Sequence, residues 1–357
     1  MLTRRNFLAG LSAVPLVSRI SFAGISSLFL SCADDRARNH HVVGFDLTGA
    51  PHFKIKLPAR GHGYAQHAAH AETIVFGRRP GSFAALVDAR AGSLAGMIDP
   101  PPGRCFYGHG TFSADGALLY VCEHDDATGN GFIGVYDAQH SYKRIGDFAA
   151  GGIGPHEVRL LPDGQTLVVA VGGILTDGKR DKLNIATMDP SIAYLDAASG
   201  KVVEQVRAPA EWHQLSIRHI DLDAQGRVAI AMQYEGDAGA SVPLAALHVR
   251  GQTALQFLRA GEDDAMRLKQ YLGDIAFSVD GATICATSPV GSVVALWDAR
   301  SGAYIAMTDA ADGCGIVSLG EAFVVSGGDG RLRRLDTAAN EPLAATSWTW
   351  DNHMAVI

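Results

Sequence analysis

The chain reads FYGHGTFSADGALLYVCEHDDATGNGFIGVYDAQHSYKRIGDF over residues 106–148. Its apolar segments are Gly108–Phe112, Leu118–Val121, Phe132–Asp137 and Tyr142–Phe148. An Ala-Asp-Gly turn separates the first two segments, a long polar loop follows the second, and a short turn precedes the last. Apolar and β-branched runs broken by Asp-Gly and Gly-rich turns are typical of hairpin-linked strands. We therefore predict one unit of four short strands in this stretch.

The same plan recurs along the chain. His62, His109 and His156 open successive units and lie 47 residues apart. Later units open at Ile217–His219, Asp274–Phe277 and Gly313–Gly315. Self-similarity at a period of this size indicates a repeat architecture in which each unit packs against its neighbours.

The two chain ends supply one further unit. The chain finishes on a single predicted strand, Asn352–Ile357, which has no partner downstream. Three unassigned strands lie near the other end, at Leu28–Ser31, His41–Asp46 and Phe53–Leu57. Pairing the chain ends closes a ring and removes exposed strand edges. The sequence thus predicts an all-β, seven-bladed β-propeller whose C-terminal strand pairs with the N-terminal strands.

Composition limits the functional classes. The 357 residues are 47% hydrophobic and 19% charged, which suits a folded body. A formal net charge of −7 argues against a nucleic-acid partner, which needs a basic face. The five cysteines include no CxxC pair, so neither a thioredoxin-like motif nor haem attachment is indicated, and disulfides are left unassigned.

The N-terminus has the pattern of an export signal. Thr3–Leu8 contains a twin-arginine pair followed by Phe-Leu, an apolar run comes next, and Ser21–Ala23 ends it with small residues. We predict a twin-arginine signal peptide over residues 1–23 and a single propeller domain over 24–357. Export in the folded state to the periplasm follows. Beyond this run, no segment of the sequence is long enough to span a membrane.

Cys32 has two interpretations. The residues before it, Leu28–Ser31, resemble a lipidation box, which would make the protein a lipoprotein. However, residues 28–46 also match residues 119–137, including an Asp-Asp pair in the loop and the aspartate that ends the following strand. This match favours a β-strand of the mature fold at Leu28–Ser31.

The turns predict which face of the ring is functional. Connections between first and second strands, and between third and fourth strands, are short and share one face. The long connections share the other face: 33–40, 123–131, 172–190, 233–243 and 260–271. Because long loops on a rigid scaffold usually carry binding sites, the long-loop face is the functional candidate.

In each unit the first strand lines the central channel and begins at the long-loop face. Five units begin with histidine: His62, His109, His156, His219 and His353. Asp274 and Cys314 occupy the equivalent position in the other two, and Glu157 replaces His156 if the register shifts by one residue. Imidazole, carboxylate and thiol groups that converge on one axis form a ligand set for a transition metal such as iron or copper.

Two other roles for these histidines remain open. In propellers of the WD type, a Gly-His pair carries a buried structural histidine bonded to a turn aspartate. An anionic small molecule is the third possibility. Candidate ligand-binding residues near the channel mouth are His213, Gln214, Arg218 and Glu235. The sequence contains no Gly-x-Ser-x-Gly elbow, P-loop or dinucleotide fingerprint, so a binding role is favoured over an enzymatic one.

Nearly the whole mature chain resembles a family of exported bacterial propellers known as domain of unknown function 1513. The segments that carry the resemblance are 61–63, 106–110, 151–157, 213–219, 233–236 and 350–353. The resemblance implies periplasmic gene clusters with imelysin-like and haem-containing redox proteins, and hence iron handling, but no established activity. Asp274 and the loop Asn184–Met188 depart from the family pattern.

Three functional hypotheses follow. The first is a non-enzymatic periplasmic propeller that holds a metal ion, or a ligand that carries one, at its histidine-rich channel mouth. The second is a protein–protein scaffold in a periplasmic iron or redox assembly. The third is a propeller hydrolase or oxidoreductase, for which the fold alone gives little support.

Overall fold

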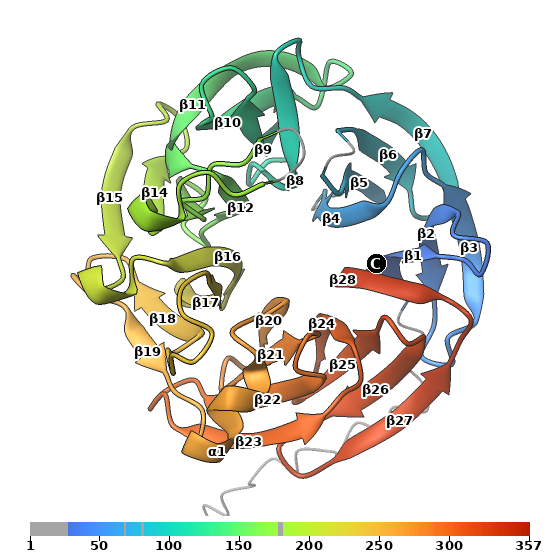
Figure 1. Ribbon diagram of the computed structural model, residues 1–357. Coiled ribbons are helices and arrows are strands. Elements are labelled where there is room, and N and C mark those ends of the chain that lie inside the picture. The colour runs from blue at the N-terminus through green and yellow to red at the C-terminus, as the bar shows by residue number, and fades with distance from the viewer. Residues whose placement is uncertain (1–27, 68, 80–81, 178–180) are drawn as a thin grey trace, which may run out of the picture.

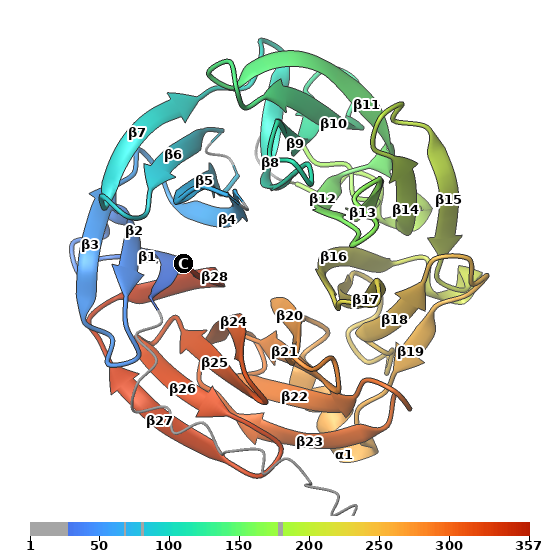
Figure 2. The same ribbon diagram turned by 180° about the vertical axis from the view of Figure 1, so that it is seen from behind.

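The computed structural model describes residues 28–357 except 68, 80–81 and 178–180. The predicted signal peptide, residues 1–23, lies outside the described residues. Seven four-stranded antiparallel sheets surround a central axis as the blades of a propeller (Figures 1 and 2). The seven-bladed, all-β prediction is confirmed.

The blades are numbered here from the chain start. Blade 1 combines β28 (Thr349–Val356) with β1 (Phe29–Asp34), β2 (His40–Phe45) and β3 (Pro51–Lys56). Blade 2 holds β4 (Gly61–Gln66), β5 (Glu72–Gly77), β6 (Ala84–Asp88) and β7 (Ser93–Ile98). Blade 3 holds β8 (Arg104–Phe112), β9 (Leu118–Asp125), β10 (Asn130–Asp137) and β11 (Lys143–Ile153).

Blade 4 holds β12 (Pro155–Leu160), β13 (Thr166–Val171), β14 (Ser191–Asp196) and β15 (Val202–Arg207). Blade 5 holds β16 (Leu215–Leu222), β17 (Arg227–Tyr234), β18 (Ala245–Val249) and β19 (Gln256–Leu258). Blade 6 holds β20 (Asp274–Phe277), β21 (Thr283–Ser288), β22 (Val293–Asp298) and β23 (Tyr304–Asp309). Blade 7 holds β24 (Gly313–Leu319), β25 (Ala322–Gly327), β26 (Arg331–Leu335) and β27 (Asn340–Ala345).

Among the described residues, the helical turns lie in connections between strands, three of them in the long connections 172–190 and 260–271. They are η2 (Ile185–Thr187), η3 (Ala210–Trp212), α1 (Glu262–Ala265) and η4 (Met266–Leu268). Within the described part of the chain, no helix is long and apolar enough to cross a membrane.

The ring closes as the sequence predicts. β28 pairs antiparallel with β1, from Phe29 opposite Val356 to Asp34 opposite Thr349. Cys32 lies inside β1, opposite Val42 of β2, and is only 3% exposed. The prediction of a strand over Leu28–Ser31 is confirmed, with the strand beginning at Phe29 and extending to Asp34.

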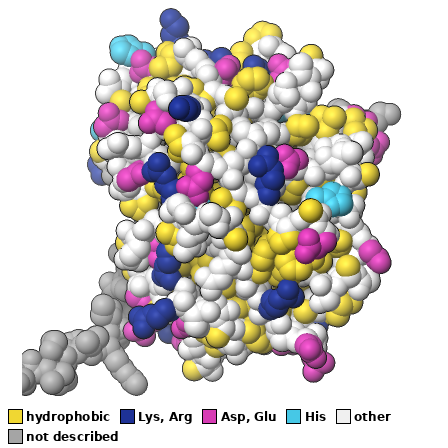
Figure 3. All heavy atoms as spheres, turned by 90° about the vertical axis from the view of Figure 1, so that its left-hand side faces the viewer, with side chains coloured by type: hydrophobic (Ala, Val, Ile, Leu, Met, Phe, Trp, Pro, Cys, Tyr) yellow, Lys and Arg dark blue, Asp and Glu magenta, His cyan; other side chains and the backbone are white. Residues whose placement is uncertain are grey.

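Apolar side chains fill the spaces between blades. All six residues of β13 are buried, whereas the outer strand β7 leaves most of its side chains exposed or half-exposed. This gradient explains why inner strands read as continuous apolar runs. Along one side of the ring, acidic and basic side chains are interspersed among apolar ones (Figure 3).

Short turns are built by aspartate and glycine. In the turn between β8 and β9, the Asp115 carboxylate accepts a hydrogen bond from the Ala117 amide, and Gly116 adopts a φ of 71°. Because only glycine adopts this conformation without steric cost, the Asp-Gly pair fixes the turn. Such a turn connects the first strand, which lines the channel, to the second strand of the same blade.

Candidate metal centre in the propeller channel

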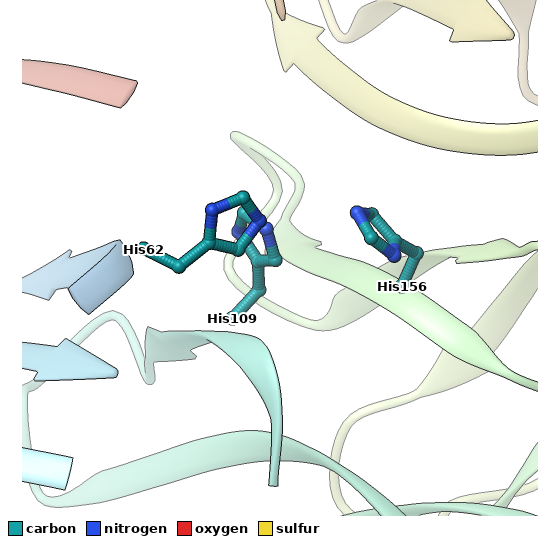
Figure 4. Close-up of side chains that lie close together, drawn as sticks. All are labelled: His62, His109 and His156. Carbon is teal, nitrogen blue, oxygen red and sulfur yellow. The ribbon is translucent and has the colours of Figure 1, made fainter. Parts of the chain in front are cut away.

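Five imidazoles converge in the channel. His62, His109, His156, His219 and His353 come from β4, β8, β12, β16 and β28. Their ring centroids lie 4.5–6.1 Å apart in the nine pairs that are in contact. Four of the rings are 2–6% exposed, and His156 is partly buried. Figure 4 shows His62, His109 and His156 projecting into a common space from three neighbouring blades.

Strand irregularities allow this convergence. Each strand that carries a channel histidine shows a shift in its pairing register at or beside that residue. A bulge of this kind turns an extra side chain toward one side of the sheet. In β12 the shift lies between Pro155 and Glu157, and both His156 and Glu157 reach the channel cluster.

Glycines beside the histidines make room for neighbouring blades. A Cβ atom on Gly63 would lie 2.4 Å from the Gly108 carbonyl oxygen and 2.6 Å from His109 Nδ1. A Cβ on Gly108, which has a φ of 101°, would lie 2.9 Å from the His62 ring. The Gly-His-Gly pattern of the sequence is therefore a packing requirement of the cluster.

Three of the histidines are backed by buried carboxylates. Nδ1 of His62 lies 3.2 Å from Asp351, Nδ1 of His219 lies 3.3 Å from Glu157, and Nδ1 of His353 lies 3.3 Å from Asp274. An ionised carboxylate only accepts hydrogen bonds, so each Nδ1 carries the proton and each Nε2 presents a lone pair. Proteins hold metal-binding histidines in this way.

Ring nitrogens of the channel histidines lie close enough to share one ion. Candidate ligand atoms of His62, His219 and His353 all lie within 4.8 Å of one another, as do those of His62, His109 and His156. Metal–nitrogen bonds of about 2.0–2.1 Å place ligands roughly 3–4 Å apart around an ion. Nε2 of His109 and Nε2 of His353 are buried without a hydrogen-bond partner, which is a rare state for a buried polar atom.

Burial keeps most of these rings neutral. It lowers the pKa of His62 to about 3 despite the nearby Asp351, and it lowers the pKa values of His109, His156 and His219 as well. Burial acts in the same direction on His353, but Asp274 outweighs it and raises the pKa of that ring. Neutral imidazole is the form that binds a metal.

The supporting carboxylates are ionised by their cationic neighbours. Burial opposes ionisation of Asp351, yet its contacts with His62, Arg60 and Arg78 hold the pKa far below the usual range. Arg159 does the same for Glu157, to which it donates at 2.8 Å. Four of the five imidazoles are therefore neutral, and two of the supporting carboxylates, Asp351 and Glu157, are paired with arginines.

The other predicted channel residues have different positions. Asp274 contacts His353 and accepts a hydrogen bond from the Ile316 amide, so it supports a histidine in this structure. The Cys314 thiol donates to the Asp312 carbonyl at 3.0 Å and belongs to none of the candidate ligand groups found among the described residues. The carboxylate partners of the histidines come from channel strands and not from tight turns, unlike the WD-type arrangement.

Of the four predicted ligand-binding residues, one lines the channel mouth and a second contacts cations that line it. Arg218 lines a cavity there, and Glu235 forms an ion pair with Lys182 and lies 3.9 Å from Arg218. His213 instead contacts the Ala210 carbonyl at 3.2 Å, and Gln214 donates to the Ile185 carbonyl at 3.4 Å. The ligand-binding role of these residues stays a prediction.

The histidine layer separates two cavities. The upper one, about 100 Å³, opens toward the long loops and is lined by cations: Arg78, Arg79, Lys182 and Arg218. The lower one, about 240 Å³, lies along the first strands toward the short turns and is lined by Glu157, Asp221, Asp274 and Arg159. The channel is thus cationic on one side of the imidazoles and acidic on the other.

Sequence reasoning missed several residues of this site. Asp351 was noted only within the segment 350–353, and its position two residues before His353 was the available signal. Arg78, Arg79 and Tyr107 line the upper cavity, but nothing in their local sequence distinguishes them from surface residues. Their role depends on how separate blades meet.

Comparison with known proteins locates the chain among relatives. The family described as "Protein of unknown function (DUF1513)" matches residues 55–357. No curated protein matches the chain significantly. Among solved structures, Kuenenia stuttgartiensis hydrazine synthase is similar, with 18% identity and a TM-score of 0.63 over 88% of this chain and 93% of that chain. At this identity the likeness shows a shared propeller fold.

Proposed function

The chain belongs to the DUF1513 family of proteins of unknown function, and we propose that it is a non-enzymatic propeller that binds a transition-metal ion in its channel. The observation that carries this proposal is the set of three buried histidines, His62, His219 and His353, each held by a carboxylate on Nδ1. Each Nδ1 faces a carboxylate, which leaves Nε2 of each ring available to a metal ion, and candidate ligand atoms of the three residues lie within 4.8 Å of one another.

The donor set indicates which ions fit. His109 offers a further candidate nitrogen, because its Nε2 is buried without a partner and the residue shares candidate groups with His62 and with His219. His156 differs, since its Nδ1 lies 3.5 Å from an Arg218 nitrogen that can only donate, so its Nε2 carries the proton. Imidazole ligands suit copper, zinc, nickel and iron, and copper(II) binds nitrogen ligands most tightly of the divalent ions. Copper on affinity, and iron on the family resemblance, are the ions that we propose.

The first test is metal content. Protein matured through its own export route should contain about one equivalent of one transition metal per chain, as measured by elemental analysis. His62→Ala and His219→Ala should each lower metal affinity at least tenfold, because each removes a ligand. His52→Ala is the matched control, since its side chain is 53% exposed on the outer strand β3. The proposal would be contradicted if the wild-type protein contained less than a tenth of an equivalent of metal and the two channel variants contained the same amount.

The cellular location and partners are part of the same proposal. The twin-arginine pattern at Thr3–Leu8 supports export to the periplasm, and the family resemblance supports an imelysin-like or haem-containing redox partner. Cell fractionation with N-terminal sequencing of the mature protein tests the location. Cross-linking in periplasm followed by mass spectrometry tests the partner, and recovery of neither protein class would contradict it.

A further inference from the structure

Positive charge is concentrated in the upper cavity. Arg78, Lys182 and Arg218 line it, and Arg60 lies beside it through its ion pair with Asp351. Two carboxylates, Asp351 and Glu235, contact these four cations in the described part of the chain. Arg60 and Lys182 are partly exposed, whereas the Arg78 and Arg218 side chains are 25% and 11% exposed. Because buried charges are normally paired, a surplus of such cations favours an anion beside them.

Two polar groups of this cavity lack partners. Arg218 Nε and the Tyr107 hydroxyl are both buried and make no hydrogen bond in the structure. The Arg218 side chain is only 11% exposed, and its nearest carboxylate, on Glu235, is 3.9 Å from Nη2. A guanidinium held in this state has a strong preference for an oxyanion that accepts two parallel hydrogen bonds.

Contacts between blades surround this space. The Arg79 guanidinium, from the connection between β5 and β6, lies 3.8 Å above the Tyr107 ring of β8 and donates to Thr176 at 3.1 Å. It therefore links blade 2 both to blade 3 and to the connection between β13 and β14. The space measures about 100 Å³, enough for several water molecules or for one ion of a few heavy atoms. His62, His156 and His219 line the same cavity on its channel side.

We propose that the upper cavity is a binding site for a small multiply charged oxyanion, either inorganic phosphate or a short dicarboxylate such as oxalate. Arg218 and Arg78 supply the charge, and the Tyr107 hydroxyl supplies a neutral donor. All of these contacts are made by the protein itself, so the site does not depend on the metal proposed above. In a metal-loaded protein, the anion would lie on the long-loop side of the imidazole layer.

The test uses the full-length mature protein after EDTA has removed bound metal. Anion binding is then measured without metal, so a negative result bears on the anion site and leaves the metal proposal untouched. Isothermal titration at low ionic strength is carried out with phosphate, oxalate and, as a control anion, chloride. We expect phosphate or oxalate to bind with a dissociation constant below about 1 mM and chloride not to compete at the same concentration. Binding of only one oxyanion identifies the class. Binding of neither at about 10 mM overturns the proposal.

Substitutions of Arg218 and Tyr107 test whether these side chains bind the oxyanion. Arg218→Met should weaken oxyanion binding at least tenfold, because it removes a charge-assisted donor pair. Tyr107→Phe should weaken it about fivefold, the loss of one neutral hydrogen bond, and is the safer variant because it keeps the ring under Arg79. Arg300→Met, on an exposed turn, is the charge-matched control. Equal affinities for Tyr107→Phe, Arg218→Met and Arg300→Met would overturn the proposal.

Discussion

At the scale of single residues, the site depends on which ring nitrogen of each histidine carries the proton. Asp274 accepts hydrogen bonds from the backbone and faces Nδ1 of His353, so it sets which nitrogen of that ring is free. Replacing the carboxylate by an amide keeps the shape but removes the charge that fixes the tautomer. We expect Asp274→Asn to lower metal affinity by about 10–100-fold.

The measurement is a competition titration with a chromogenic chelator. Asp280→Asn, in the exposed turn of the same blade, is the control for a lost carboxylate. If Asp274 is instead a ligand, as the sequence alone allowed, the variant also changes the absorption spectrum of the bound metal. An unchanged affinity would contradict both roles.

Neutral buried histidines also make the metal-free protein sensitive to acid. The pKa values of His62, His109, His156 and His219 are lowered in the fold, whereas the unfolded chain titrates near 6.5. Below pH 6.5 the unfolded chain therefore takes up protons that the folded chain does not, and stability falls as pH falls. Each such ring removes at most about 1.4 kcal/mol per pH unit.

His353 has a raised pKa and acts in the opposite direction, since its contribution is present at low pH and lost as pH rises through the folded value. Four rings have a lowered pKa and one ring has a raised pKa, so the net effect is that acid destabilises the fold. Guanidinium unfolding of the EDTA-treated protein at pH 7.5, 6.5 and 5.5 should show a falling midpoint. His62→Gln should flatten the dependence, and a midpoint independent of pH would count against neutral rings.

At the scale of elements, strand irregularities and glycines bring the rings together. Gly63 in β4 lies against the backbone of β8, where a Cβ atom would meet the Gly108 carbonyl oxygen at 2.4 Å. Gly63→Ala should therefore destabilise the fold by about 1–3 kcal/mol, as overpacking does, and weaken metal binding by separating His62 from His109. Calorimetry and metal titration measure the two effects.

Gly96→Ala is the matched control for that substitution. Gly96 lies in the outer strand β7, and the nearest atom to an added Cβ is 3.8 Å away, an ordinary contact. This variant should retain full stability and metal binding. Equal behaviour of the two variants would show that the close approach of β4 and β8 is not needed.

The elements also show how far sequence reasoning reaches. Strand positions and ring closure follow from local patterns, such as the 47-residue spacing of His62, His109 and His156. The meeting of five imidazoles also follows, since equivalent repeat positions point to one axis. The pairing of His219 with Glu157 does not follow, because it depends on a shift of register in β12 and on contacts between blades.

At the scale of the whole molecule, the channel separates charge along its axis. Arg78, Lys182 and Arg218 lie on the long-loop side of the imidazole layer, and Glu157, Asp221 and Asp274 line the cavity on the short-turn side. This lower cavity reaches the surface, since the exposed side chains of Gln66 and Val356 also line it. Arg159 also lines this cavity and pairs with Glu157, which leaves Asp221 and Asp274 to attract cations into it.

We expect the metal ion to enter from the short-turn side, and Asp221 to guide it. The Asp221 carboxylate accepts a hydrogen bond from the Phe277 amide at 2.8 Å, and it lines the entrance cavity. Asp221→Asn should slow metal uptake a few-fold at low salt and less at high salt, as expected for electrostatic steering. The final stoichiometry should not change, because the residue is not among the candidate ligands.

Stopped-flow uptake measurements test this entry route. Burial raises the pKa of Asp221 to about 6, so uptake by the wild-type protein should slow as pH falls through 6 and Asp221→Asn should lack that step. Asp115→Asn removes a carboxylate from an exposed turn on the same face and should leave the rate unchanged. If Arg218→Met accelerated uptake while Asp221→Asn had no effect, the ion would enter through the upper cavity, and the charge on the short-turn side would have another role.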